Sequence, residues 1–361
     1  MGHPGLAAAL LASLTLSTFG AGAQDTIPAA VFQRIERALG EELAARRIPG
    51  LSVAVGAAGE LRWSAGLGMA DLENLVPARA GTVYRTGSIA KPITAVAVLQ
   101  LAERGKLDLD APVQEYVPEF PTKPWPVTAR LLLGHLAGIR HYRAREFLSV
   151  EHYFNLRDPL KVFMDDPLMA EPGTKFVYST YGYSLLGAIV EAAAGMPFTR
   201  YLEEHIFRPA GMVSTRADDV FAIIPNRARG YRLLNDGRLH NATLVDTSNK
   251  IPGGGLVATA EDLVRLGLAL QRGTLLGKAS RDAMFTPQRL KDGRSTGYGL
   301  GWYITRAEGR ARYHHGGAQS GASTFLALYP QRHVVLAWMM NLEGVTAAAV
   351  ASRLEAILLV P

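Results

Sequence analysis

Apolar residues along this chain follow two spacings, and the changes between them mark the expected elements. From residue 29 to 50 the spacing is helical, with Ile35, Leu39 and Leu43 four apart, and it ends at Gly50. Two apolar runs, "LSVAVGAAG" and "ELRWSAGLGMAD", then predict a hairpin of strands. The β-type run "TVYRT" leads into a helix predicted from about residue 88 to 104, with a proline in its first turn, where a missing N–H costs little.

The middle of the chain lacks long periodic runs. From residue 105 to about 250 prolines and aromatic residues are frequent, and helices are predicted near 128–137, 183–194 and 197–206. A further helix follows the glycine run at 253–255, because Thr259 and Asp262 are spaced as a capping box. The last quarter alternates as strands, in "YGLGWYIT", "RARYHHGG", "STFLALYP" and "HVVLAWMMN", before a closing helix in "VTAAAVASRLEAILLV".

Strands at both ends and helices between them predict an α/β fold. We expect an antiparallel sheet flanked by helices and built from both chain ends, with a mostly helical subdomain inserted beside it. The predicted boundaries are 24–104 and 251–361 for the sheet domain and 105–250 for the helical subdomain. A functional site is expected in the cleft between these two parts.

The first 23 residues add a prediction about location. They contain no Lys, Arg, Asp or Glu, and an apolar stretch runs into the small-residue site "AGA" that ends at Ala23. This pattern is typical of an export signal cleaved after Ala23, so we expect a periplasmic or secreted protein. A retained membrane anchor is the alternative, but the run is shorter than the roughly 20 residues that span a bilayer. No other segment is apolar and long enough to span a membrane.

Composition excludes several kinds of chemistry. The 361 residues are 48% hydrophobic and 19% charged, as in globular proteins, with a formal net charge of +6. Cysteine is absent, which excludes disulfides and thiol catalysis. The basic cluster "RHYRAREF" at 140–147 is interpreted as a solvated face in preference to an anion-binding patch. No motif indicates a nucleic-acid partner.

The first candidate site is the pair Ser88 and Lys91. A helical offset of three places the two side chains next to each other. Serine becomes nucleophilic when a base removes its proton, and an amine serves as that base only if burial or nearby positive charge lowers its pKa. The apolar run "PITAVAVL" that follows predicts such burial, and the helix start offers a backbone N–H near Ser88 to an oxyanion. The alternative is a capping serine beside a surface lysine.

The second candidate is Tyr178, which lies in "PGTKFVYSTYGYSLLG" just before a predicted helix. A tyrosine beside an ammonium can ionise below its usual pKa of about 10 and carry a proton between nucleophile and leaving group. The alternative is a core tyrosine with a satisfied hydroxyl group.

The third candidate is the strand "YHHGGAQSGASTF", which narrows into glycines. Gly316 and Gly317 would let a substrate backbone lie against the strand edge, and the amide of Ala318 could point into the cleft. His314 and His315 face opposite sides of a strand, so we expect no metal site. A Ser-His-Asp hydrolase is disfavoured because the chain has no G-x-S-x-G elbow.

Taken in order, these three stretches resemble the motifs of the serine β-lactamase-like hydrolases related to class C β-lactamases and D-Ala-D-Ala peptidases. Those motifs are Ser-x-x-Lys, Tyr-x-Asn and Lys-Thr-Gly, and they are specific only in combination. The resemblance extends over about residues 30 to 358, through "GKLDLDAPVQEYVPEFP", "LLLGHLAGIRHY", "IFRPAGM" and "YGLGW". "GGGLVAT" and "YSTYGYSLLGAIVE" are most similar to the branch that includes the mitochondrial serine β-lactamase-like protein.

The resemblance implies a role for each motif. Ser88 would be the acylated nucleophile, Lys91 its proton acceptor, and Tyr178 the general base and acid. The amides of Ser88 and Ala318 would form the oxyanion hole, and His315, Gly316 and Gly317 would occupy the Lys-Thr-Gly strand. The resemblance also implies the β-lactamase/DD-peptidase-like fold and no cofactor.

Two departures from the family pattern shape the predicted activity. Thr180 stands where the family usually has Asn, so a short hydroxyl replaces the amide that would reach for the substrate. His315 stands where β-lactamases have Lys, so a fixed cation that would grip a substrate carboxylate is weakened. We therefore expect an exported serine hydrolase acting on a small-molecule or peptide substrate, as a peptidase or esterase. The alternatives are a class C-type β-lactamase and a non-catalytic penicillin- or peptide-binding module. The sequence leaves the oligomeric state open.

Overall fold

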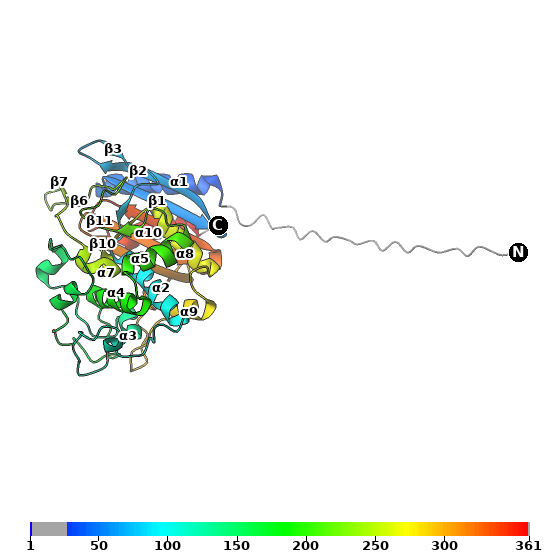
Figure 1. The fold of residues 1–361 in the computed structure, drawn as a ribbon. Helices are drawn as coiled ribbons and strands as arrows, with labels where there is room; N and C mark the ends of the chain where they lie inside the picture. The colour runs from blue at the N-terminus through cyan, green and yellow to red at the C-terminus, as the bar shows by residue number, and fades with distance from the viewer. Residues whose placement is uncertain (2–26, 360–361) are drawn as a thin grey trace.

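A seven-stranded antiparallel sheet forms the centre of the protein in the computed structural model, which describes Met1 and residues 27–359. The strand order is β3-β2-β1-β12-β11-β10-β9, so strands from both chain ends are interleaved (Figure 1). The strands of this sheet are β1 (Gly50–Ala57), β2 (Glu60–Asp71), β3 (Val76–Pro77), β9 (Tyr303–Ala307), β10 (Arg310–Gln319), β11 (Ala322–Tyr329) and β12 (Val334–Met340). The α/β prediction of a sheet built from both ends is confirmed.

Helices flank the sheet and fill the inserted region. The α-helices are α1 (Ala29–Arg46), α2 (Ala90–Glu103), α3 (Ala129–Leu133), α4 (Thr180–Ala194), α5 (Phe198–Leu202), α6 (Arg208–Ala210), α7 (Ile251–Gly254), α8 (Ala260–Arg272), α9 (Lys278–Met284) and α10 (Ala347–Leu358). Shorter turns are the 3₁₀ helices η1 (Gly87–Ile89), η2 (Val113–Glu115), η3 (Ala144–Leu148), η4 (Asp158–Val162), η6 (Ser248–Lys250) and η7 (Pro330–Arg332), and the π-helical η5 (Glu203–Phe207).

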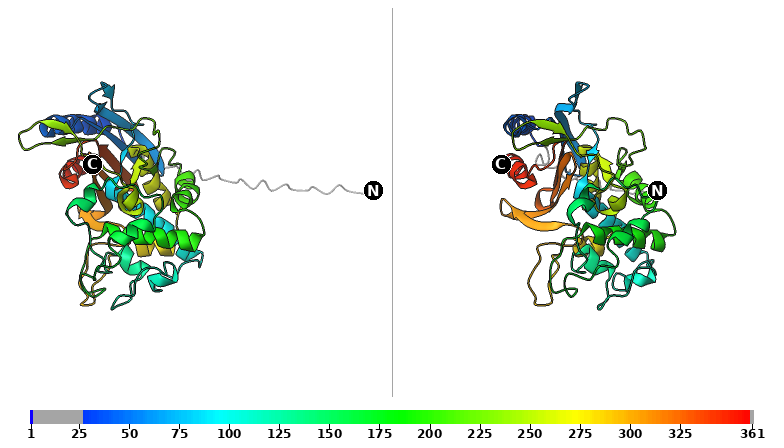
Figure 2. Two further views of the ribbon diagram at one scale, coloured as in Figure 1. Left: turned by 60° about the vertical axis from the view of Figure 1, so that its left-hand side comes forward. Right: turned by 90° about the vertical axis from the view of Figure 1, so that its left-hand side faces the viewer.

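Two small sheets complete the secondary structure. One has the order β4-β8-β5, and the other is a hairpin of β6 and β7. Their strands are β4 (Tyr84–Arg85), β5 (Arg216–Ala217), β6 (Tyr231–Leu233), β7 (Leu239–Asn241) and β8 (Leu256–Ala258). In both turned views the helical region, green to cyan, lies beside the sheet, while α1 and α10 lie together on the sheet's other side (Figure 2).

The alternation of side chains in the sheet divides the core into two layers. Val53 of β1 and Trp338 of β12 belong to the layer that α1 and α10 cover. Their neighbours Ala54 and Ala337 point the other way, into the layer formed by α8, α2 and α4. This period of two is what a strand requires, and both layers are apolar because both faces are covered.

In the helical region α4 and α5 pack against α2, and α3 packs against α4. The α2 residues Ala90 to Leu101 are all buried. A helix that is apolar on every side is a central helix, which explains why this segment carries so few charges. The predicted domain boundaries, 24–104 with 251–361 and 105–250, stay a prediction. The predicted signal at 1–23 falls outside the described residues, apart from Met1.

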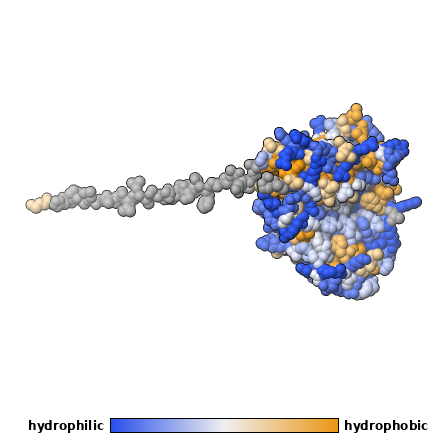
Figure 3. Space-filling view, turned by 180° about the vertical axis from the view of Figure 1, so that it is seen from behind, coloured by the Kyte–Doolittle hydropathy of each residue, from blue (hydrophilic) through white to orange (hydrophobic). Residues whose placement is uncertain are grey.

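The molecular surface is mixed in character. The face in Figure 3 shows mostly hydrophilic residues, with apolar residues in scattered groups. Within the part of the chain that the structure describes, we find no helix with the length and apolar character needed to cross a membrane.

Candidate active site

The hydroxyl of Ser88 and the amine of Lys91 lie together at the start of the central helix. Ser88 belongs to η1, and Lys91 follows it on α2, so the predicted offset brings Nζ of Lys91 to 3.1 Å from Oγ of Ser88. Lys91 is fully buried, whereas Ser88 is only half-buried. The base therefore lies beneath the nucleophile, and solvent reaches the nucleophile first.

Lys91 has three hydrogen-bond neighbours. Besides Ser88, its Nζ lies 2.7 Å from the carbonyl oxygen of Gly253 and 3.1 Å from Oγ1 of Thr180. No carboxylate forms a salt bridge with Lys91 within residues 27–359. Burial, together with the nearby charge of Lys250, holds the pKa of Lys91 well below its usual range.

An uncharged amine can make all three contacts. A neutral amine has two N–H donors and one lone pair, so it can donate to the Gly253 carbonyl and to the Thr180 hydroxyl. Its lone pair then accepts the hydrogen bond of the Ser88 hydroxyl. This arrangement can remove the serine proton. It also places the Thr180 hydroxyl against Lys91, whereas we had expected that hydroxyl to reach a substrate.

Tyr178 is the third member of the cluster. Its hydroxyl lies close to the Ser88 side chain, and Nζ of Lys91 lies 4.8 Å from the centre of its ring. Burial raises the pKa of the Tyr178 phenol, which corrects our expectation that an adjacent ammonium would lower it. The cause is removal of the phenol from water, which disfavours the phenolate, so the phenol stays protonated at rest.

The position of Tyr178 is set by the cap of the next helix. Ser179 is the N-cap of α4, and its Oγ accepts a hydrogen bond from Gly182 N at 3.0 Å and donates to the Arg140 carbonyl at 2.6 Å. Tyr178 is thus the last residue before a firmly bonded helix start.

Two histidines, His135 and His141, support the same loop. Nδ1 of His135 accepts the N–H of Ser179 at 3.1 Å, and Nδ1 of His141 accepts the N–H of Thr180 at 3.2 Å. Burial lowers the pKa of both, to about 4 for His141, so both rings are neutral acceptors. Their side chains hold the backbone on either side of Ser179.

The strand β10 passes directly beside η1. Gly87 has a φ of 51°, and a Cβ there would lie only 2.6 Å from the amide nitrogen of Ala318. Gly317 approaches as closely, since its Cβ would lie 2.0 Å from the Thr86 carbonyl oxygen. These glycines let the backbone of Ser88 and the amide of Ala318 lie next to each other, as an oxyanion hole requires.

The far part of β10 leaves an edge open at the site. The ladder with β9 ends at His314, whereas the ladder with β11 continues to Gln319, so residues 315–319 are paired on one side only. Gly316 is half-buried and Ala318 is exposed. An extended substrate backbone could pair with this edge, and the substrate-binding role of Gly316 and Gly317 stays a prediction.

His315 is buried and does not face the open edge. Its Nε2 lies 3.1 Å from the Tyr298 hydroxyl and its Nδ1 lies 2.6 Å from the Gly316 carbonyl, so Nδ1 carries the proton. Burial lowers the pKa of His315 to about 3. The ring is therefore uncharged at neutral pH and supplies no cation for a substrate carboxylate.

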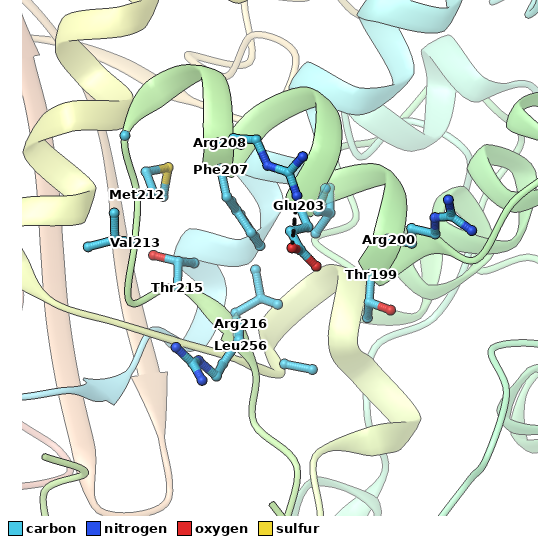
Figure 4. A pocket seen from close by; sticks show the side chains of 13 residues that line it. Thr199, Arg200, Glu203, Phe207, Arg208, Met212, Val213, Thr215, Arg216 and Leu256 are labelled. Atoms are coloured by element: carbon cyan, nitrogen blue, oxygen red, sulfur yellow. Dashed lines mark hydrogen bonds and ion pairs between the residues drawn. The ribbon is translucent and has the colours of Figure 1, made fainter. Parts of the chain in front are cut away.

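A surface pocket of about 730 Å³ lies elsewhere, between the α5–α6 segment and β5 (Figure 4). Its lining includes Phe207, Met212 and a hydrogen-bonded pair of Arg208 and Glu203, 3.3 Å apart. It shares no residue with the Ser88 cluster and holds no nucleophile beside a base. Among the described residues, no three His, Cys, Asp or Glu side chains converge so that they could hold a metal ion.

The chain is similar to known proteins over most of its described length. The family model described as Beta-lactamase matches residues 32–359. The human "Serine beta-lactamase-like protein LACTB, mitochondrial" is 36% identical over 298 residues, which cover 63% of this chain and 54% of that protein. "Penicillin-binding protein 4*" of Bacillus subtilis is 30% identical over 302 residues, covering 79% of this chain and 66% of that protein. The chain spans just over half the length of the mitochondrial relatives it matches.

The structural comparison points the same way. The octameric penicillin-binding protein homologue from Pyrococcus abyssi superposes with a TM-score of 0.80 and 26% sequence identity. The match covers 91% of this chain and 77% of that one. The antiparallel sheet and the helices beside it are thus a known arrangement of elements.

Proposed function

The chain belongs to the beta-lactamase family of serine hydrolases, and from this premise we propose that it forms an acyl-enzyme on Ser88 and releases it with water. The substrate is a small molecule or peptide with an amide or ester bond. The observation that carries the proposal is the contact of 3.1 Å between Oγ of Ser88 and the buried Nζ of Lys91.

The first half of the reaction is acylation. The lone pair of Lys91 takes the proton of the Ser88 hydroxyl as Oγ attacks the substrate carbonyl carbon. The amides of Ser88 and Ala318 stabilise the negative charge that develops on the carbonyl oxygen. When the intermediate collapses, the C–N or C–O bond breaks, and the leaving group receives a proton through Tyr178, which Lys91 replenishes.

The second half is hydrolysis of the acyl-enzyme. Lys91 is again an uncharged base once its proton has left with the first product. A water molecule gives a proton to Lys91 through Tyr178 and attacks the acyl carbon. The ester bond to Ser88 then breaks, and Oγ recovers a proton from Lys91, so the resting state is restored.

A peptidase or esterase is favoured over an efficient β-lactamase. Penicillins carry a carboxylate, and the position that a family lysine would occupy holds His315, which is buried and neutral. The edge of β10 from Gly316 to Ala318 accepts a substrate backbone without requiring that charge.

The experiment is a substrate panel on two proteins. Short-chain p-nitrophenyl esters, D-amino-acid peptides and nitrocefin are offered to the wild type and to Ser88→Ala, with folding checked by circular dichroism. We expect the wild type to hydrolyse esters or peptides faster than nitrocefin, and Ser88→Ala to be inactive while folded. Equal activity of the two proteins would require another nucleophile, and no activity in either would favour a binding module.

We further propose that the protein is exported. The support is the uncharged apolar stretch of residues 1–23 with its small-residue site at Ala23. Expression in a bacterial host followed by intact-mass measurement of the secreted or periplasmic product tests it. A product lacking residues 1–23 supports export, and full-length protein retained in the cytoplasm contradicts it.

A further inference from the structure

Lys250 is a second fully buried lysine, and the reaction proposed above does not use it. It ends η6, immediately before α7, and its Nζ donates a hydrogen bond to the Phe147 carbonyl at 2.5 Å. The same Nζ lies over two aromatic rings, 5.0 Å from the ring centre of Tyr142 and 4.7 Å from that of Phe147. In residues 27–359 this amine forms no salt bridge. A buried lysine without a carboxylate partner is costly, which suggests a functional reason for keeping it.

Charged and titratable groups face Lys250 from each segment around it. Arg85 lies on β4 and Asp246 lies four residues before Lys250, while Lys91, His141 and Tyr142 face it from the active-site side.

The nearby carboxylate is already engaged by other partners. Asp246 bonds to Nδ1 of His152 and to the N–H of Ser248, each at 2.8 Å, and is not in hydrogen-bond contact with Lys250. Burial, together with the charge of Arg85, lowers the pKa of Lys250 to about 7. Lys250 is therefore charged in mildly acidic medium and becomes uncharged above neutral pH.

Lys250 is connected to Lys91 by two short routes. The first runs through side chains, since the Tyr142 hydroxyl, on the ring beneath the Lys250 amine, lies close to the side chain of Thr180, whose own hydroxyl lies 3.1 Å from Nζ of Lys91. The second runs through the backbone, because α7 begins directly after Lys250 and carries the Gly253 carbonyl that contacts Lys91. The charge of Lys250 is also one of the two causes that lower the pKa of Lys91.

We propose that Lys250 is a positioning residue that keeps Lys91 uncharged and directed at Ser88 when the medium is mildly acidic. Its amine contacts Phe147 and Tyr142 and forms no hydrogen bond with Ser88. Its cationic head, held over Tyr142, disfavours a second positive charge on Lys91, so the base stays available at a pH where it would otherwise be protonated. The inference rests on the proposed function, because Lys91 must be the base for the effect to appear in the rate.

The test measures the rate of covalent labelling by a fluorophosphonate from about pH 5 to pH 10, because labelling requires Lys91 to accept the serine proton. The variants are Lys250→Met, which removes the charge, and Lys250→Arg, which keeps it, with Lys106→Met as a control at an exposed lysine. For Lys250→Met we expect the acidic limb of the pH–rate profile to move up by about one pH unit, because one nearby positive charge is lost. Labelling is then about tenfold slower near pH 6 and unchanged near pH 9. Lys250→Arg and Lys106→Met should keep the limb at or below the wild-type position.

A uniform loss of rate at every pH would mean a purely structural role and would overturn the proposal, as would an unmoved acidic limb. If Lys250→Met fails to fold, Lys250→Gln keeps a donor for the Phe147 carbonyl and carries the same test. A ¹⁵N NMR titration of the lysine amines in the wild type adds a measurement that needs no variant. One buried amine must titrate near pH 7, and the absence of such a titration would contradict the inference. Failure of the wild type to be labelled on Ser88 would instead reject the proposed function.

Discussion

Replacing the buried Lys250 by methionine should remove a pH-dependent stability penalty. The pKa of this amine is about 7 in the folded protein because of burial and the Arg85 charge, against about 10.4 in an unfolded chain. Between those two values the unfolded state binds more protons, so the stability of the wild type rises with pH. Methionine fills similar space and has no proton to bind, so this contribution is absent from the variant.

The magnitude follows from the linkage relation. One group in this window changes the free energy of unfolding by about 1.4 kcal/mol per pH unit. Between about pH 7.5 and pH 9.5 the wild type should therefore gain about 2.7 kcal/mol relative to Lys250→Met. At the lower pH the stability of the variant is closest to that of the wild type, or exceeds it, because burial of the Lys250 amine destabilises the wild type most at that pH.

The assay is urea unfolding at both pH values, followed by the fluorescence of the four tryptophans. The exposed Lys106→Met serves as the matched control, and its difference from the wild type should not change with pH. If the difference between wild type and Lys250→Met is also the same at both pH values, the amine titrates alike in the folded and unfolded chain. The account of a desolvated Lys250 would then be wrong.

Three further predictions concern the reaction site. Tyr178→Phe should lower kcat by about 10² to 10⁴, the range for a lost proton-transfer group, with an unchanged circular dichroism spectrum. A kcat within a factor of three of wild type would contradict the assigned role. Gly87→Ala should slow Ser88 labelling at least tenfold and lower the melting temperature, because its Cβ would meet the Ala318 amide at 2.6 Å. The control Gly81→Ala, with open space around it, should change neither the labelling rate nor the melting temperature. His315→Asn should leave the pH profile of kcat/KM between about pH 5 and 8 unshifted, because the pKa of His315 is about 3 and the ring is neutral throughout; loss of a limb near pH 6 would show a charged imidazole.

Local patterns in the sequence predicted most of the elements. The side chain of Thr259 caps α8 by accepting from Asp262 N at 3.1 Å, as its spacing indicated. The ninth strand shows the limit of such patterns, since "YGLGWYIT" predicts a strand from Tyr298 but β9 begins at Tyr303. The first residues form a turn instead, closed by the bond from Gly299 N to the Trp302 carbonyl at 2.8 Å.

The central pair of the site was also predictable, because burial of Lys91 follows from the apolar helix around it. The supporting groups were not, since their partners are distant in sequence: His135 contacts a residue 44 positions away. No spacing in the sequence singles out Lys250. Its burial is evident only in the folded chain, where the loop at 142–147 covers it. The wrong prediction for the pKa of Tyr178 has the same origin, because the phenol is buried by segments distant in sequence and burial disfavours its ionised form.

The most direct test of the account is the site of covalent modification. Wild type and Ser88→Ala are incubated with a fluorophosphonate, and the adduct is located by intact mass and peptide mapping. We predict a single adduct on Ser88 in the wild type and none in the variant. An adduct on any other residue, or no adduct on the folded wild type, would contradict the claim that a buried, uncharged Lys91 activates this serine.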